Sequence, residues 1–447
     1  MSTSHLKLYL IIIWAMVAAV LLVGLALWGL TNLPTAQPAS ETPTPTLSPS
    51  PTVPPTPALA PTIMIIRATP RPGGAIELPP TWTPITPQAM FDASEAPPGV
   101  DPLTGLKVDD PSRLERRPIA VKVSNFPRSL RPYQSGLTKA DVVYEYYIED
   151  GLSRFIAVYY GQDAERAGPV RSGRYFDENI MRMYHSALVF ADADDRVRSY
   201  LLGKADLRNL LFLPRDDNCP PLCRDKTIPS TAGGGYNNVF VNTAGVGAFI
   251  NNAKQKLRPT FFNTLFHLIP TAPVSRVYTR YSAYSYNYWE YDETQKKYLR
   301  YSDANDALNG QGEVYAPHID QLTNQQLAAD NVVVLVVPHL FKNGFDRADQ
   351  LFDIQMIGSG EAYAFIDGQM YQVLWKRDQL DQPIQLVDAG NNPLSLKPGE
   401  TYYEVIDPES SARLDGVTMT FIFSIPPRVL TATPRPRKPT LTPNTHK

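Results

Sequence analysis

The sequence predicts an α+β protein in which a mixed α/β domain is followed by a mainly antiparallel β domain, both preceded by a transmembrane helix and a disordered linker. Three observations support this prediction. An apolar run at 8–30 leads into Pro/Thr-rich chain, strand and helix patterns alternate over 101–257, and short strand patterns with turn residues between them fill 274–425. Alternation is typical of mixed α/β folds, and short punctuated strands are typical of antiparallel sheets.

Residues 8–30 are uncharged and mostly apolar. About 20 such residues suffice to cross a bilayer as a helix, so residues 1–33 are predicted to be a single-pass membrane anchor. His5 and Lys7 precede the run, and no charge follows it until Glu41. The positive-inside rule therefore places the N-terminus in the cytoplasm and the C-terminal bulk outside the cell membrane. The alternative is a cleaved signal peptide, whose apolar region is usually shorter, at about 7–15 residues.

Residues 34–100 are predicted to form a proline-rich linker, and residues 426–447 a disordered tail of similar composition. Such a segment cannot bury a core and stays extended and semi-rigid. At about 3.1 Å per residue, the linker would hold the folded part at most about 200 Å from the membrane. The expected location of that folded part is extracytoplasmic, in the cell envelope.

Several function classes are disfavoured by composition and motif content. The net charge of −2 provides no basic field for nucleic acid. The sequence contains no zinc-protease motif, phosphate-binding loop or nucleophile elbow, so neither a metal site nor a cofactor is expected. Cys219 and Cys223 are predicted to form a local disulfide outside the membrane, with two free thiols or a pair of zinc ligands as alternatives.

The stretch at 131–179 carries the densest polar chemistry. Runs at 141–149 and 153–160 are rich in β-branched and aromatic residues and flank Gly151, which predicts a β-hairpin. The period of two in a strand places Glu145 and Glu149 on the same face of the first strand.

A helix over 174–184 is predicted to follow the hairpin, with Ser172 at its capping position. Arg171 and Arg174 flank this serine, and Arg154 belongs to the second strand of the hairpin. Free backbone N–H groups at a helix start, together with guanidinium groups, attract anions such as a carboxylate, a phosphate or a charged wall polymer. The alternative is structural, with these arginines bound to carboxylates of the hairpin and helix.

Carboxylates in the same region suggest a second function, hydrolysis of a wall polymer. Glu145 and Glu149 would lie about 13 Å apart along one strand. Glycosidase carboxylates lie about 5–9.5 Å apart, so these two do not make one catalytic pair, although each could pair with a group on a neighbouring strand. Asp192 and Asp194 would be about 7 Å apart. The alternative for these aspartates is a solvated turn that caps a helix over 196–202.

Other expected elements of the first domain are strands at 118–124, 187–191 and 239–242, and a helix over 243–257 capped by Thr243. The second domain has strand patterns at 274–281, 286–291, 297–301, 331–337, 361–366, 370–376, 402–405 and 417–423. Nine aromatic residues crowd 278–301. They could stack on sugar rings, or they could pair across strands within the sheet. His318-Ile319-Asp320 is expected to be a turn.

Four ordered motifs resemble the DUF3048 (YerB-like) family of bacterial envelope proteins: Arg131-Pro132-x-Gln134-Ser135-Gly136-Leu137, Ala140-Asp141-x-Val143-Tyr144-Glu145, Glu149-x-Gly151-x-Ser153-Arg154-Phe155 and Gly168-Pro169-Val170-Arg171-Ser172. A second segment, Gly358-x-Gly360 to Pro398-Gly399-x-Thr401, fits the same pattern. The resemblance spans 101–408. It implies an envelope location and no defined activity, because the family is one of unknown function. Histidines that the family pattern carries after the strand at 187 and near 237 are absent here. No Cys follows the apolar run, so the lipid anchor of relatives is not possible in this chain.

The sequence therefore favours a membrane-tethered protein that binds an envelope component: a wall glycan or peptide (peptidoglycan), or a wall enzyme. The predicted ligand-binding residues are Glu145, Glu149, Arg154, Arg171, Ser172, Arg174 and Asp192. The alternative is a wall-polymer hydrolase with paired carboxylates, and the sequence identifies no catalytic residue.

Overall fold

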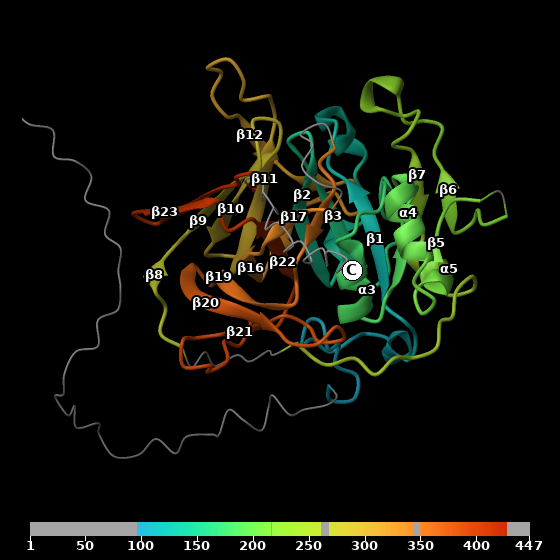
Figure 1. The fold of residues 1–447 in the computed structure, drawn as a ribbon, viewed down its shortest axis with the longest axis horizontal. Helices are drawn as coiled ribbons and strands as arrows, with labels where there is room; N and C mark the ends of the chain where they lie inside the picture. The colour runs from blue at the N-terminus through green and yellow to red at the C-terminus, as the bar shows by residue number, and fades with distance from the viewer. Residues whose placement is uncertain (1–95, 216, 261–267, 343–348, 427–447) are drawn as a thin grey trace, which may run out of the picture. The chain divides into compact units, whose positions relative to one another are not determined.

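A computed structural model describes residues 96–215, 217–260, 268–342 and 349–426 (Figure 1). All of these residues belong to one compact unit. The predicted membrane anchor, nearly all of the linker and nearly all of the tail lie outside the described residues. Within the described ranges, no helix has both the length and the apolar character needed to cross a bilayer.

The larger of the two main sheets has eleven strands, and its order is β21-β20-β19-β16-β22-β2-β3-β1-β4-β5, with β8 paired to β20. Its strands are β1 (Ile119–Ser124), β2 (Val142–Glu149), β3 (Leu152–Tyr159), β4 (Ala187–Val189), β5 (Leu211–Phe212), β8 (Ala272–Pro273), β16 (Asn331–Val336), β19 (Gly358–Ile366), β20 (Gln369–Arg377), β21 (Gln385–Val387) and β22 (Thr401–Ile406).

The predicted N-terminal and C-terminal segments share this sheet. Strand β22, from the C-terminal segment, runs parallel to β2 of the N-terminal hairpin, with Val142 beside Thr401 and Glu145 beside Glu404. On its other side β22 runs parallel to β16. The boundaries 101–257 and 274–425 remain a prediction, but backbone hydrogen bonds join the two segments in one continuous sheet.

The second main sheet follows the order β12-β11-β10-β9-β24-β23, with β15 paired to β11. Its strands are β9 (Arg276–Arg280), β10 (Tyr286–Asp292), β11 (Lys297–Asp303), β12 (Tyr315–Pro317), β15 (Ala328–Ala329), β23 (Ser411–Asp415) and β24 (Thr418–Ile422). It packs on one face of the larger sheet, where the Trp289 ring meets the Tyr402 ring at 4.8 Å and Phe421 meets Tyr363 at 5.1 Å.

Short helices and two-stranded sheets complete the fold. The α-helices are α3 (Asp177–Met183), α4 (Asp195–Leu202) and α5 (Thr243–Val246); the 3₁₀ turns are η1 (Pro111–Glu115), η2 (Arg128–Tyr133), η3 (Leu137–Lys139), η4 (Arg208–Leu210) and η5 (Ser230–Ala232). The small sheets pair β6 (Leu222–Arg224) with β7 (Val239–Val241), β13 (Ile319–Asp320) with β14 (Gln325–Gln326), and β17 (His339–Phe341) with β18 (Phe352–Ile354). The described chain is mostly sheet with few helices, in agreement with the predicted α+β class.

The hairpin is buried on both faces, which explains its nearly continuous run of apolar and aromatic residues. On one face, the Tyr144 ring stacks on Tyr403 at 4.5 Å and meets Phe176, just before α3, at 6.0 Å. On the other face, the second sheet covers Glu145 and Phe155, which are 1% and 0% exposed. The predicted hairpin is confirmed to within one residue at each strand end.

The helix predicted over 243–257 is wrong in length, because α5 ends at Val246. Glycine in a helix interior costs up to about 1 kcal/mol, and Gly245 and Gly247 stand at its end. Asn242, rather than Thr243, is its cap, since the Asn242 side chain accepts a hydrogen bond from the Ala244 N–H at 3.1 Å.

Candidate ligand-binding cleft

A cavity of about 430 Å³ opens beside the turn of the β2–β3 hairpin. Its lining combines the hairpin end, the loop that precedes α3, the start of α4 and the residues before β18. It contains every predicted ligand-binding residue except Glu145: Glu149, Arg154, Arg171, Ser172, Arg174 and Asp192. Asp150, Asp194, Arg196 and Asp349 also line it. We call it the arginine cleft.

A bulge in β2 brings Glu149 into this cleft. The pairing of β2 with β3 shifts register between Tyr147 and Glu149. Arg154, which lies opposite Tyr146 in the pairing, and Glu149 line the same cavity, while Glu145 faces the second sheet. The prediction that Glu145 and Glu149 share a face is therefore wrong, because an extra residue in a strand reverses the side-chain alternation beyond it.

Arg154 is a buried cation without a carboxylate partner among the described residues. It is 9% exposed, and its Nη1 donates a hydrogen bond to the Ser172 carbonyl at 3.1 Å. Burial, together with the positive charges of Arg174 and Arg171 and only partly opposed by the Glu149 carboxylate, holds the pKa of Arg154 well below its usual range. Such an environment disfavours the charged guanidinium until a negative charge enters.

Two further cleft arginines, Arg174 and Arg171, are held differently. Arg174 forms an ion pair with Glu149 and donates from Nη1 to the Gly173 carbonyl at 2.9 Å, while its buried Nε has no hydrogen-bond partner among the described residues. Arg171 donates from Nη1 to the Tyr236 carbonyl at 3.0 Å, and its guanidinium lies 5.1 Å from the centre of the Tyr236 ring. Burial and the charge of Arg174 lower the pKa of Arg171.

Ser172 is not the cap of the helix, contrary to prediction. Helix α3 begins only at Asp177, and its first position receives no side-chain capping bond. The chain before it forms a tight turn in which the Arg174 N–H donates to Asp177 Oδ2 at 2.8 Å. The Gly173 N–H donates to the Asp192 carbonyl at 2.8 Å. These N–H groups are already used, so anion attraction in the cleft comes from the guanidinium groups.

The aspartates at the cleft edge are bound to arginines. Asp192 pairs with Arg198, and Asp194 pairs with Arg196 at 2.9 Å. Asp194 also caps α4 by accepting the Arg196 N–H at 2.9 Å, and hydrogen bonds from Arg196 lower the pKa of Asp194 to about 2. Arg196 reaches across the cleft to Asp349 at 2.8 Å. This geometry agrees with the capping-turn interpretation rather than with a catalytic aspartate pair.

Glu145 lies outside the cleft, in a buried network between the two main sheets. Its carboxylate accepts hydrogen bonds from Ser153 at 2.5 Å and Asn125 at 3.1 Å and forms an ion pair with Arg300 at 2.5 Å. Arg300 also contacts Glu404 at 3.3 Å. The network links β2, β11 and β22, so Glu145 holds the two sheets together.

A further buried cation, Lys122, lies close to the cleft and was not predicted from sequence. Its ammonium group lies 3.1 Å from Asp177 and contacts Tyr146, whose hydroxyl donates to the same carboxylate oxygen at 2.6 Å. Burial, opposed by Asp177 and reinforced by Arg154 and Arg174, lowers the pKa of Lys122 to about 7. The available signal was a lysine in the middle of an apolar strand, Ile119–Ser124.

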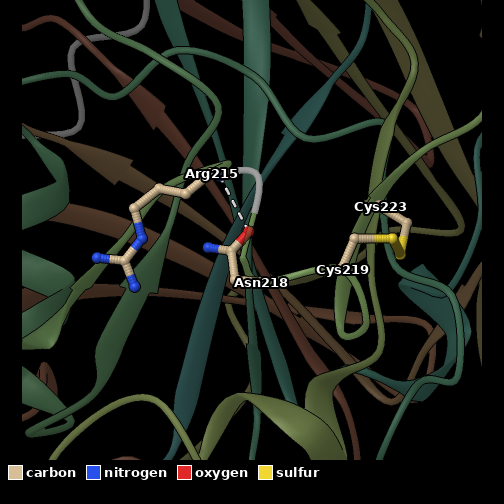
Figure 2. Close-up of a disulfide and its surroundings, with 4 residues drawn as sticks. All are labelled: Arg215, Asn218, Cys219 and Cys223. Atoms are coloured by element: carbon tan, nitrogen blue, oxygen red, sulfur yellow. Dashed lines mark hydrogen bonds between the residues drawn. A yellow bond between two sulfur atoms is a disulfide. The ribbon is translucent and has the colours of Figure 1, made fainter.

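The cysteine pair and His318, the remaining residues considered in the sequence, make contacts within the fold. Cys219 and Cys223 are joined in a disulfide, close to a turn closed by the Arg215 N–H and the Asn218 side chain at 3.0 Å (Figure 2). His318 is buried, with Nδ1 2.8 Å from Ser302 Oγ. Among the described residues, no group of three or more His, Cys, Asp or Glu side chains could hold a metal ion.

Comparison with known proteins gives a family. The model of the DUF3048 N-terminal domain, of unknown function, matches residues 103–256, and that of the DUF3048 C-terminal domain matches residues 277–403. The chain belongs to the DUF3048 family. The two matched regions meet in the shared sheet, at the β2–β22 pair, and the arginine cleft lies mostly within the first of them.

Relatives support the same assignment. The protein named "Putative lipoprotein YerB" from Bacillus subtilis (strain 168) is 27% identical over 332 residues, which cover 71% of this chain and 89% of that protein. The crystal structure of YerB from Bacillus subtilis matches with a TM-score of 0.56 and 25% identity over 69% of this chain and 96% of that one. Neither name assigns a ligand or an activity.

Proposed function

We propose that this DUF3048 protein is held at the membrane and uses the arginine cleft to bind an anionic group of an envelope component, such as a carboxylate or phosphate of a wall polymer. The single observation that carries the proposal is Arg154. It is a buried guanidinium without a described carboxylate partner, placed beside two further arginines. A buried unpaired charge is costly, and a bound anion would remove that cost.

The membrane part of the proposal rests on other support. The related protein carries the name "Putative lipoprotein YerB", and residues 8–30 of this chain offer an apolar anchor in place of a lipid. The long Pro/Thr-rich linker would then separate the cleft from the bilayer. We infer an extracytoplasmic orientation from the positive charge that precedes the apolar run.

Hydrolysis is disfavoured because the candidate carboxylates are ion-paired or buried outside the cleft. Two free carboxylates facing each other across the cleft would support it. Instead, Glu149 is bound to Arg174, Asp192 to Arg198 and Asp194 to Arg196, while Glu145 is buried elsewhere. An arginine-rich cleft whose acids, apart from Asp150 at the hairpin turn, pair with arginines supports binding.

Binding of detergent-solubilised full-length protein to two soluble probes, a glycerol-phosphate polymer and a carboxylate-bearing muropeptide, tests the proposal. We expect saturable binding of at least one probe that weakens with added salt. Arg154→Gln should abolish most of the binding and leave the melting temperature unchanged or higher, because it removes an uncompensated buried charge. Arg276→Gln, an exposed arginine of the second sheet, is the matched control. Equal binding by the Arg154 variant would contradict the proposal.

A further inference from the structure

A groove of about 550 Å³ lies on the second sheet and shares no lining residue with the arginine cleft. Its floor is formed by Tyr278 and Arg280 of β9 and Thr420 of β24, and its wall by the loop that ends in Glu313 and Tyr315. This is within the size range of small-molecule sites, about 300–1,000 Å³. From this geometry we propose that the groove binds an uncharged oligosaccharide.

The aromatic corner of the groove offers ring surface for a sugar. The rings of Tyr278 and Tyr315 meet edge to face, with centroids 5.8 Å apart and planes at 74°. Tyr278 also packs on Tyr288, and Tyr288 stacks on Tyr301 at 4.6 Å. The predicted cross-strand pairing of these aromatics is therefore present. It fixes the rings in place, so that little side-chain entropy remains to be lost when a ligand stacks on them.

The polar edge of the groove is preorganised in a way that suits hydroxyl groups. Glu313 accepts a hydrogen bond from the Tyr315 hydroxyl at 2.6 Å and pairs with Arg280 at 3.4 Å. One carboxylate cannot engage all five N–H donors of a guanidinium. The pair therefore presents both donors and acceptors beside a ring face, which is the combination that vicinal hydroxyl groups can use.

The charge of the groove selects a neutral ligand. Arg280 and Glu313 are the charged residues of its lining, and they compensate each other. In the arginine cleft, by contrast, Arg154 has no described carboxylate partner. An anionic polymer would find no uncompensated cation in the groove, and a cationic one would find no uncompensated anion. An uncharged glycan therefore fits it better than a charged one.

The loop that forms the wall is pinned to the sheet. The Tyr286 hydroxyl donates to the Asn305 carbonyl at 2.9 Å and accepts the Val314 N–H at 3.1 Å. The Asn305 side chain donates to the Gly312 carbonyl at 3.1 Å. A Cβ placed on Gly312 would meet no heavy atom within 4 Å. Because Gly312 lines the groove, a large side chain at this position would start in open space beside it and leave the packed residues in place.

Calorimetric titration of the full-length protein in detergent tests the proposal with two matched probes. Fully N-acetylated chitotetraose is neutral, and its de-acetylated form is cationic. We expect saturable binding of the neutral probe and at least about tenfold weaker binding of the charged one. Arg280→Gln should weaken binding of the neutral probe by about tenfold or more. Arg276→Gln on the same sheet face, whose Glu290 pair lies outside the groove, should leave it unchanged.

Gly312→Trp provides a second variant that does not touch the polar pair. It should abolish binding of the neutral probe while the melting temperature stays within about 2 °C of wild type. Absence of saturable binding by the wild type, or equal binding by Gly312→Trp and wild type, would overturn the proposal. Equal affinity for the neutral and cationic probes would overturn the selection by charge.

Discussion

Two arginine–carboxylate clusters lie on opposite faces of the same hairpin. They differ in whether each arginine has a carboxylate partner. Between the sheets, Arg300 contacts both Glu145 and Glu404, and the side chains of Arg300 and Glu145 are at most 2% exposed. In the arginine cleft, Glu149 is 30% exposed and binds Arg174, while Arg154 has no described carboxylate partner. The arginine of the buried cluster therefore has its carboxylate partners without a ligand, whereas Arg154 in the cleft does not.

Replacement of Arg300 should break the buried cluster and cause the largest loss of stability. Arg300→Gln would leave Glu145 and Glu404 side by side without their shared cation. Breaking a buried ion pair from one side typically costs about 3–5 kcal/mol, so chemical denaturation should show a loss of that order. The exposed Arg276→Gln variant should change stability by less than about 0.5 kcal/mol. A similarly small loss for Arg300→Gln would mean that the cluster does not hold the sheets together.

A comparably large effect should come from Lys122 and depend on pH. The groups around its ammonium are Tyr146, Asp177, Arg154 and Arg174, and its pKa is lowered from 10.5 to about 7 in the folded protein. The unfolded chain therefore binds more protons between these values, and the free energy of unfolding should rise with pH across this window. Each unit of pKa shift corresponds to about 1.4 kcal/mol.

Lys122→Met supplies the reference for that measurement. The difference in unfolding free energy, wild type minus variant, should grow between about pH 7 and about pH 10 and stay flat below about pH 6.5. Contributions from other titrating groups cancel in the difference. A difference that is constant with pH would show that Lys122 stays charged throughout.

Replacing Arg171 and Arg174 of the cleft should cost less stability. Arg171→Gln with Arg174→Gln removes one partly exposed ion pair and a contact with Tyr236, so we expect a loss of about 1 kcal/mol together with weakened binding of the anionic probe. A fall of many degrees in the melting temperature would give these arginines a structural role. An unchanged melt with unchanged binding would place the ligand site elsewhere.

The smallest effect on stability should come from Glu149→Gln. This variant tests whether Glu149 competes with a ligand for Arg174. A partly exposed ion pair is worth about 0–1 kcal/mol, so stability should change little. Arg174 would lose its internal anion and become free for a ligand, and anion affinity should rise. Reduced affinity would show that Glu149 contributes to binding rather than competing with the ligand.

The sequence predicted the parts of this arrangement that depend on local pattern. Gly151 and the flanking β-branched and aromatic residues were sufficient for the hairpin, and the arginines around Ser172 were sufficient to locate the cleft. The bulge that separates Glu145 from Glu149 has no local signal, because it inserts no distinctive residue. The helix expected from 174 begins at Asp177, since the Arg174 N–H binds the Asp177 carboxylate instead.

Contacts between residues far apart in the chain could not be predicted from the sequence. Nothing near Glu145 indicates that Arg300 is its partner, because their contact depends on how two sheets pack. Likewise, the hydrophobic pattern of Thr401–Ile406 predicts a strand but not its neighbours. The anchor, the linker and the binding of an envelope component remain predictions.

The position of β22 has a consequence for synthesis of the protein. Strand β2 lies early in the chain, yet one of the two strands that pair with it, β22, begins only at Thr401. Until that residue has left the ribosome, the hairpin exposes an open edge of unpaired N–H and C=O groups, and such edges promote aggregation. A chain that ends between the two family regions would keep that edge permanently. Expressed as separate fragments, the two regions should therefore be insoluble, and a nascent chain should need protection until its C-terminal strands arrive.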